Sequence, residues 1–317
     1  MSNDYLWDKS GPPDPDVQRL EKLFGGMKFD RPLMPAEPPR KWLRLSPIAA
    51  ALIVICSAAW LLRPMPNSGW KLELVQDGAV HHTGMLAAGQ TVVTGATSHA
   101  KLALANFAEL EVEPNSRVQL IESRHGKARM SLQLGLIHAL VRAPAGNFSI
   151  ATPSATAVDL GCAYTLQVDA AGNGLLRVDS GWVSFEWKGR EVFIPAGAIC
   201  TTHREKGPGV PYFEESSDRF RHAVDRFDVS RSAADLNDIL ASATKDDAFT
   251  LWHLLPRVQG NDRARIYDRL VALGPPPSSI NREAILSLNG RAMDGLWDSF
   301  GLDDTTEWRK WKRPWSQ

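Results

Sequence analysis

Apolar residues recur with different periods along this chain, and the most uniform stretch runs from Leu45 to Leu62. It contains no Asp, Glu, Lys, Arg or His. As a helix it would rise about 27 Å, close to the hydrocarbon thickness of a bilayer. We therefore expect residues 42–63 to form a single transmembrane helix. Three alternatives remain open: a cleaved signal peptide, a lipoprotein anchored at Cys56, or a helix buried in a protein core.

The residues that flank this stretch predict its orientation. Arg40, Lys41 and Arg44 precede it, whereas Arg63 alone follows directly. Basic residues collect on the cytoplasmic side of a span. We therefore expect a single-pass protein of the bacterial inner membrane, with a cytoplasmic N-terminus and periplasmic C-terminal domains. Membrane lipid would be one of its partners.

Residues 1–41 show a helical period over a short segment only. Val17, Leu20, Leu23 and Phe24 form one apolar stripe, ended by Gly25-Gly26. Pro15 suits the first turn of such a helix, and the residues from Asp30 to Arg40 are rich in proline and predict a semi-rigid linker. So short a helix cannot bury its stripe alone. It either folds against a partner or remains a tail with nascent helical structure.

From Trp70 the period changes to the alternation of short β-strands. Asp77-Gly78 lies between two such runs and is a strong signal for a hairpin. Further runs follow to about His203, separated by Gly, Asn and Pro, without a helical stretch. Evenly spaced short strands of this kind predict an all-β sandwich, jelly roll or related roll. We assign residues 70–205 to a jelly-roll-like all-β domain.

The helical period returns in residues 214–317, which we expect to form an α-helical C-terminal module. Phe220, Val224 and Phe227 share one stripe, and Ser232 is suited to cap the next helix. The tail combines tryptophans with Arg and Lys. Its tryptophans either pack onto the module or form an aromatic and cationic patch that grips cell wall, membrane surface or a partner.

Composition and motifs argue against catalysis and against nucleic acid. Lys+Arg and Asp+Glu each total 36, so the formal net charge is +0, and no basic excess favours a nucleic-acid partner. The histidines and cysteines do not fall at the spacings of metal ligands. There is no phosphate-binding loop, no GxGxxG and no nucleophile elbow. We therefore expect no enzyme, no catalytic residue, no metal and no cofactor.

Several motifs of the β region occur together and in order. They are LAAGQTVVTGATSHAKLAL, AELEVEPNSRVQL, FSIATPSATAVDLGCAYTLQV, GLLRVDSGWVSF and IPAGA. In this order they resemble the FecR-type domain, over about Trp70 to Thr202. The resemblance implies a regulator of sigma factors at the bacterial inner membrane. An exported β-domain would receive a signal, and the cytoplasmic end would hold or present an extracytoplasmic-function sigma factor.

Two cysteines, Cys162 and Cys200, fall in the β region. An exported compartment permits a disulfide between them, and two buried thiols are the alternative. If the bond forms, it closes a loop that would stabilise the domain by about 3–4 kcal/mol.

These observations lead to one functional prediction and one alternative. The prediction is a multi-domain, membrane-anchored signalling protein that acts as an anti-sigma or sigma-regulating factor through protein–protein contact. Its partner-binding residues would be Val17, Leu20, Leu23 and Phe24, and the exported domain would meet an envelope partner that the sequence does not identify. The alternative is a structural or polymer-binding protein of the cell envelope without sigma-factor regulation.

Overall fold

The computed structural model describes residues 15–27, 69–278 and 280–302, and the chain divides into two compact units, residues 1–63 and 64–317. In the first unit the described part is helix α2 (Pro15–Phe24), which continues into a short 3-10 turn, η1 (Gly25–Met27). The helix begins at the predicted proline, whose fixed φ suits the first turn.

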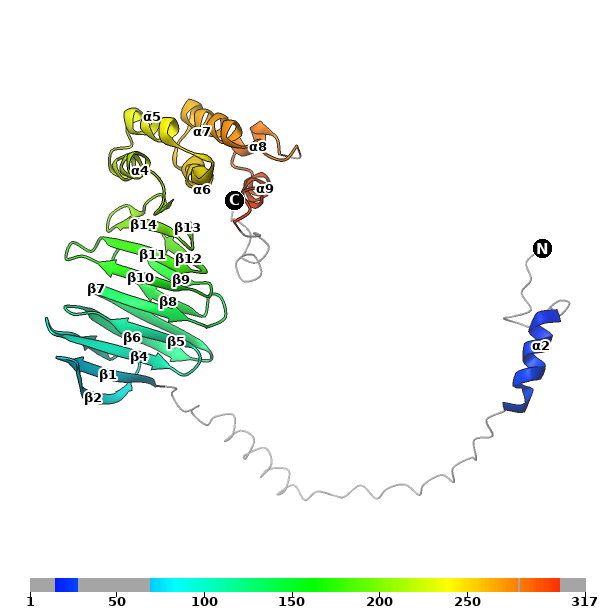
Figure 1. Cartoon of the computed structure of the whole chain (residues 1–317), viewed down its shortest axis with the longest axis horizontal. Coiled ribbons are helices and arrows are strands. Elements are labelled where there is room, and N and C mark those ends of the chain that lie inside the picture. Colours follow the sequence, from blue (N-terminus) through cyan, green and yellow to red (C-terminus); the bar gives the residue numbers. More distant parts are fainter. Residues whose placement is uncertain (1–14, 28–68, 279, 303–317) are drawn as a thin grey trace, which may run out of the picture. The chain divides into compact units, whose positions relative to one another are not determined.

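The second unit begins with a series of short strands (Figure 1). Their bounds are β1 Trp70–Gln76, β2 Ala79–Leu86, β3 Thr91–Val93, β4 Ser98–Leu104, β5 Ala108–Val112, β6 Arg117–Arg124, β7 Lys127–Val141, β8 Phe148–Ala151, β9 Thr156–Asp159, β10 Ala163–Val168, β11 Gly174–Ser180, β12 Trp182–Trp187, β13 Arg190–Pro195, β14 Ala198–His203, β15 Gly207–Pro208 and β16 Tyr212–Phe213. Asp77 and Gly78, both with positive φ, make the predicted β1–β2 turn.

The strands form two sheets that share strand β7. Sheet A contains β2, β1, β4, β5, the second half of β7, β10, β11 and β14, with β15 and β16 at its end. Sheet B contains β3, β6, the first half of β7, β8, β9, β12 and β13. All pairings are antiparallel except β7 with β8. The sheet region is therefore mixed.

Strand β7 passes from sheet B to sheet A at Gly135, which has a positive φ of 101°. A Cβ atom there would clash with Ser116. The Ser116 hydroxyl instead accepts the Leu136 N–H at 3.0 Å. Only glycine combines this backbone conformation with this approach, so the residue fixes the point where the two sheets diverge.

The parallel pairing of β7 with β8 corrects the jelly-roll part of the predicted fold class. A jelly roll is built from antiparallel strands, whereas this region contains both kinds of pairing. Alternation in the sequence identifies strands but not the direction in which they pair, and so it could not reveal the parallel pair.

The helices follow the last strands and form the C-terminal region of the unit (Figure 1). Their bounds are α4 Asp218–Ser230, α5 Ala233–Ser242, η2 Lys245–Asp247, α6 Ala248–Leu254, η3 Leu255–Arg257, α7 Gly260–Leu273, α8 Arg282–Leu286 and α9 Gly290–Asp298. Phe220, Val224 and Phe227 are buried, as the helical stripe predicts. Ser232 accepts the Asp235 N–H and caps α5.

Sheets and helices share one continuous hydrophobic core. Trp297 of α9 is fully buried and packs against Trp182 and Phe193 of sheet B, with ring centroids 5.8 and 6.5 Å apart. Phe249 of α6 packs against Phe213 of β16 at 4.7 Å. Aromatic side chains that the sequence pattern assigned to separate regions thus join those regions.

A group of charges, which we call the junction cluster, also joins the helices to sheet A. It consists of Asp228 and Arg257, which are buried, and Arg231, which is exposed. Arg257 donates hydrogen bonds to the carbonyl oxygens of Pro208 and Gly209 at 3.1 and 2.6 Å. Asp228 accepts the N–H of the next residue, Val210, at 2.6 Å, and its other oxygen lies 3.5 Å from both arginines. Burial lowers the pKa of Arg257 to about 10.

The predicted single transmembrane helix is not supported, and this part of the fold class is corrected. Within residues 15–27, 69–278 and 280–302, no helix is long and apolar enough to span a bilayer. The longest, α7, has 14 residues, against the roughly 20 that a hydrocarbon core requires. Leu45–Leu62 itself lies outside the described residues. The expected localisation was argued from that segment and stays a prediction, as do the domain limits 1–41, 42–63, 70–205 and 214–317.

Candidate functional site

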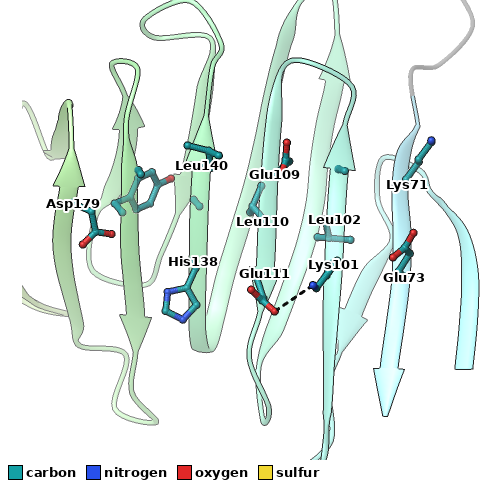
Figure 2. A pocket seen from close by; sticks show the side chains of 14 residues that line it. Lys71, Glu73, Lys101, Leu102, Glu109, Leu110, Glu111, His138, Leu140 and Asp179 are labelled. Atoms are coloured by element: carbon teal, nitrogen blue, oxygen red, sulfur yellow. Dashed lines mark ion pairs between the residues drawn. The ribbon is translucent and has the colours of Figure 1, made fainter. Parts of the chain in front are cut away.

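A groove of about 490 Å³ lies on the exposed face of sheet A, mainly across β1, β4, β5 and β7 (Figure 2). We call it the sheet A groove. Its lining comprises Lys71, Glu73, Lys101, Leu102, Ala103, Glu109, Leu110, Glu111, His138, Ala139, Leu140, Ala163, Tyr164 and Asp179. Residues of both kinds, charged and apolar, thus border the groove.

Strand alternation explains why charged and apolar residues meet here. Leu102, Leu110 and Ala139 point into the core and are almost fully buried. Their neighbours Lys101 and Glu111 therefore point to the opposite face. The apolar alternation that builds the core thus also arranges the charged side chains on the other face.

Strand register then sets these side chains in a row. Glu73 pairs with Lys101, Lys101 with Glu111, and Glu111 with His138. The Lys101 Nζ atom lies 3.9 Å from a Glu111 oxygen, as the dashed line in Figure 2 marks. Opposite charges directly across a sheet attract each other. Glu73, Lys101 and Glu111 alternate in sign along the row, so it does not form a patch of one charge.

Hydrogen bonds hold one end of this row. The His138 Nδ1 atom lies 3.0 Å from the Thr165 hydroxyl, and its Nε2 atom lies 3.5 Å from a Glu113 oxygen. A second row runs parallel, where Arg142 donates to Glu109 at 2.7 Å. The side chains of Lys101, Glu111, Arg142 and His138 remain roughly half exposed. Exposed pairs of this kind contribute little to stability, about 0–1 kcal/mol, and so remain available for recognition.

The groove offers no arrangement for a metal. In the part of the chain that the structure describes, no three His, Cys, Asp or Glu side chains lie close enough together to bind one. The expected absence of a metal, a cofactor and catalysis stays a prediction.

The predicted partner-binding residues lie on helix α2. The helix buries none of its residues: Leu20, Leu23 and Phe24 are 53%, 71% and 58% exposed, and Val17 is partly exposed. These four residues lie on one face of the helix, as their helical spacing predicts. Nothing in the structure tests what binds to them.

The two cysteines of the sheets are free and buried, so the structure has no disulfide between them. Cys162 donates to Asp159, and Cys200 lies 3.6 Å from the Gly209 carbonyl oxygen. Cys200 pairs with Leu176, which pairs with Leu166, four residues beyond Cys162. The two Cα atoms are therefore separated by roughly 13 Å along the strands as well as by two strand spacings, too far for a disulfide. The expected bond is corrected to its alternative, two buried thiols.

Asp159 is a buried carboxyl group that sequence patterns did not single out. It is 1% exposed and accepts the Gly161 N–H at 2.8 Å and the Cys162 thiol. Burial raises the pKa of Asp159 to about 6 and that of the Cys162 thiol well above its ordinary value. A raised thiol pKa disfavours the reactive thiolate, so this pair suits a structural role.

Sequence patterns also did not indicate the sheet A groove. Alternation in each strand indicated which residues face outward, but only the pairing register brings Glu73, Lys101, Glu111 and His138 into one row. A single sequence carries no direct signal of register between distant strands.

The comparisons with known proteins bear on this sheet region. The family model described as "FecR protein" matches residues 90–184, from just before β3 into β12. This range includes Lys101, Glu111 and His138 of the groove. This stretch is thus similar to FecR-type domains, as the sequence motifs predicted. The match covers less than half of the chain and includes neither α2 nor the C-terminal helices.

Structural similarity is weaker. Two crystal structures of a "putative anti-sigma factor" from Parabacteroides distasonis ATCC 8503, at 1.65 and 2.50 Å, each align with a TM-score of 0.35. Identity is 11% and 12%, over 42% and 47% of this chain and 63% and 74% of theirs. The chain thus spans less than two thirds of the first of them. At these values the likeness carries no inference about function. No curated protein matches the chain.

Proposed function

We propose that this protein regulates an extracytoplasmic-function sigma factor by direct contact, without catalysis. The FecR-type match at residues 90–184 is the observation that carries this proposal. In this mechanism α2 holds the sigma factor, and the sheet A groove receives the partner that brings the signal.

Helix α2 supports the first contact because its stripe is exposed. Covering Val17, Leu20, Leu23 and Phe24 with a partner would remove about 250–300 Å² of apolar surface from water, roughly 6–7 kcal/mol before ordering costs. Ordering the helix and its side chains on binding offsets several kcal/mol of this free energy. The remainder suits a contact that forms and releases readily, as a regulator requires.

The sheet A groove supports the second contact because its charges are exposed and arranged by a rigid sheet. Rows of alternating sign favour a partner with a complementary alternation, since a mismatched charge would be repelled. The same alternation disfavours nucleic acid, which attracts surfaces of one positive sign.

The first experiment separates the apolar face of α2 from its polar face. Full-length protein is tested by two-hybrid assay against every extracytoplasmic-function sigma factor of its source bacterium. We expect one of them to bind. Leu20→Asp should weaken that binding about thirtyfold or more, because a charge would be buried without a partner. Gln18→Asp makes the same change of charge on the opposite face of the helix and should bind like the unmodified protein.

Two outcomes contradict the proposal. If no sigma factor of the panel binds, the sigma-regulating function is wrong. If Leu20→Asp and Gln18→Asp bind equally well, the docking role of α2 is wrong. A reporter gene that depends on the bound sigma factor should be deregulated by Leu20→Asp and should be expressed normally with Gln18→Asp.

A further inference from the structure

A pocket of about 300 Å³, lined mostly by apolar residues, lies in the C-terminal helices, between the end of α7, the prolines that follow it and the end of α9. Its main lining side chains are Tyr267, Leu270, Val271, Leu273, Leu296 and Phe300. Among the residues that the structure describes, Lys245 is the one charged residue that borders it. This composition is typical of a site for an apolar group rather than for an ion.

The pocket has a rigid floor and an accessible rim. Tyr267, Leu270 and Leu296 are 6%, 3% and 3% exposed and belong to the core. Val271 is 37% exposed at the rim. Phe300 packs on Trp297 with centroids 6.3 Å apart. At about 300 Å³ the pocket lies at the lower end of ligand-site sizes, so it suits one bulky side chain.

The last described residues of the chain border this pocket. Phe300 and Gly301 line it, and Leu302 is the last residue that the structure describes. Residues 303–317 follow, and their only large apolar side chains are Trp308, Trp311 and Trp315. Trp308 comes seven residues after Gly301, a length of chain that can extend over about 23 Å. That is ample to return an indole ring to the pocket that Gly301 borders.

We propose that this pocket binds the C-terminal tail of the same chain, with the indole of Trp308 as its occupant. A segment attached at the pocket rim competes at an effective concentration of about millimolar, far above that of a free ligand. An indole offers a large apolar area at a small cost in conformational entropy. The neighbouring Arg309 and Lys310 remain free to stay in water at the rim.

Proteolysis of the full-length protein tests this contact. Arg309, Lys310 and Lys312 are trypsin sites next to the proposed anchor. Cleavage of a segment that opens transiently follows the population of its open form. Trp308→Ala should therefore speed cleavage of the tail about tenfold, as followed by intact-protein mass spectrometry. Trp315→Ala should leave the rate unchanged, because that residue is not the anchor.

Variants of the pocket provide the second arm. Val271→Asp places a charge at the rim and should speed tail cleavage about tenfold. Val229→Asp is its matched control, since Val229 is also exposed near the end of a helix but does not line the pocket. Gly274→Leu adds a side chain at a pocket-lining position with extended backbone, where an added Cβ meets nothing within 4 Å. It should displace the tail with little change in Tm.

Three results would overturn the proposal. The first is that trypsin cleaves the tail of the unmodified protein as fast as the tail of Trp308→Ala. The second is that Val271→Asp, Gly274→Leu and Val229→Asp all keep the Tm of the unmodified protein and have the same rate of tail cleavage. The third is protection that disappears on roughly hundredfold dilution, which would mean that the tail binds a second copy rather than its own chain.

Discussion

The junction cluster and the sheet A groove are both groups of charged side chains at sheet A, the first from helices that pack on it and the second from its own strands, and their surroundings differ. In the junction cluster, Asp228 and Arg257 are 2% and 6% exposed and are bound to backbone groups of β15 and the residues after it. In the groove, Lys101 and Glu111 are 56% and 44% exposed. Removing one buried charge leaves its partner unpaired in a medium of low dielectric, whereas water replaces an exposed partner. The difference separates charges that fix the fold from charges that are free to recognise a partner.

The largest expected effect is at the junction cluster. Asp228→Ala removes the acceptor of the Val210 N–H and leaves Arg257 buried beside fewer acceptors. We expect the free energy of unfolding to fall by about 3–5 kcal/mol, as measured by urea denaturation. Asp238→Ala is the control, because its pairs with Arg219 and Arg226 are exposed. Its cost should be about 1 kcal/mol or less, and equal costs for the two variants would remove the distinction between the regions.

A second expected effect depends on pH and arises from His253, buried among aromatic rings of the helical module. Burial lowers the pKa of His253 to about 3, from an ordinary value of 6.5. Between these values the unfolded state binds more protons, so stability is lost as pH falls from about 6.5 towards 3. In this range the free energy of unfolding falls by up to about 1.4 kcal/mol per pH unit.

The variant His253→Gln should lose much of this pH dependence. Unfolding free energies of both proteins, measured by urea denaturation from pH 7 to about pH 4, should converge as the pH falls. His222→Gln controls for the removal of an imidazole at an exposed position of the same module. Parallel curves for the unmodified protein and His253→Gln would contradict the assignment.

Asp159 should act with the opposite sign and over a narrower window. Burial raises the pKa of Asp159 to about 6, from an ordinary 3.8. The folded state therefore binds more protons between these values, and stability is lost as pH rises from about 3.8 through 6. Asp159→Asn should gain stability relative to the unmodified protein as the pH rises over that range. A constant difference between the two proteins from pH 4 to pH 7 would exclude this role.

The smallest expected effect on stability is in the sheet A groove. Lys101→Glu should change the unfolding free energy by only about 0.5 kcal/mol, because its pair with Glu111 is exposed. Signalling should nevertheless fail in this variant while sigma-factor binding by α2 persists. The swap Lys101→Glu with Glu111→Lys should restore the pair but not the original order of signs, so signalling should stay impaired. Normal signalling in both variants would exclude the groove as the receiving surface.

Local pattern was sufficient for the elements that depend on neighbouring residues. Asp77-Gly78 predicted its hairpin because both residues tolerate positive φ. Pro15 marked the start of α2, Ser232 the cap of α5, and the spacing of Phe220, Val224 and Phe227 a buried stripe. The ordered motifs of the β region identified the FecR-type domain that the family model matches at residues 90–184. Each of these signals consists of a few neighbouring residues or of the order of motifs along the chain. Both can be seen in a single sequence.

Tertiary structure decided whatever depends on contacts between distant segments. Pairing register separated Cys162 from Cys200 and aligned Glu73, Lys101, Glu111 and His138, because register is set by packing across strands and not within one. The parallel pairing of β7 with β8, which the expected jelly roll lacks, depends on packing between strands for the same reason. The junction cluster joins residues 208–210 to residues 228 and 257, and such a contact depends on how the helices fold back onto sheet A. The sequence determined the local elements, and only their packing determined which side chains meet.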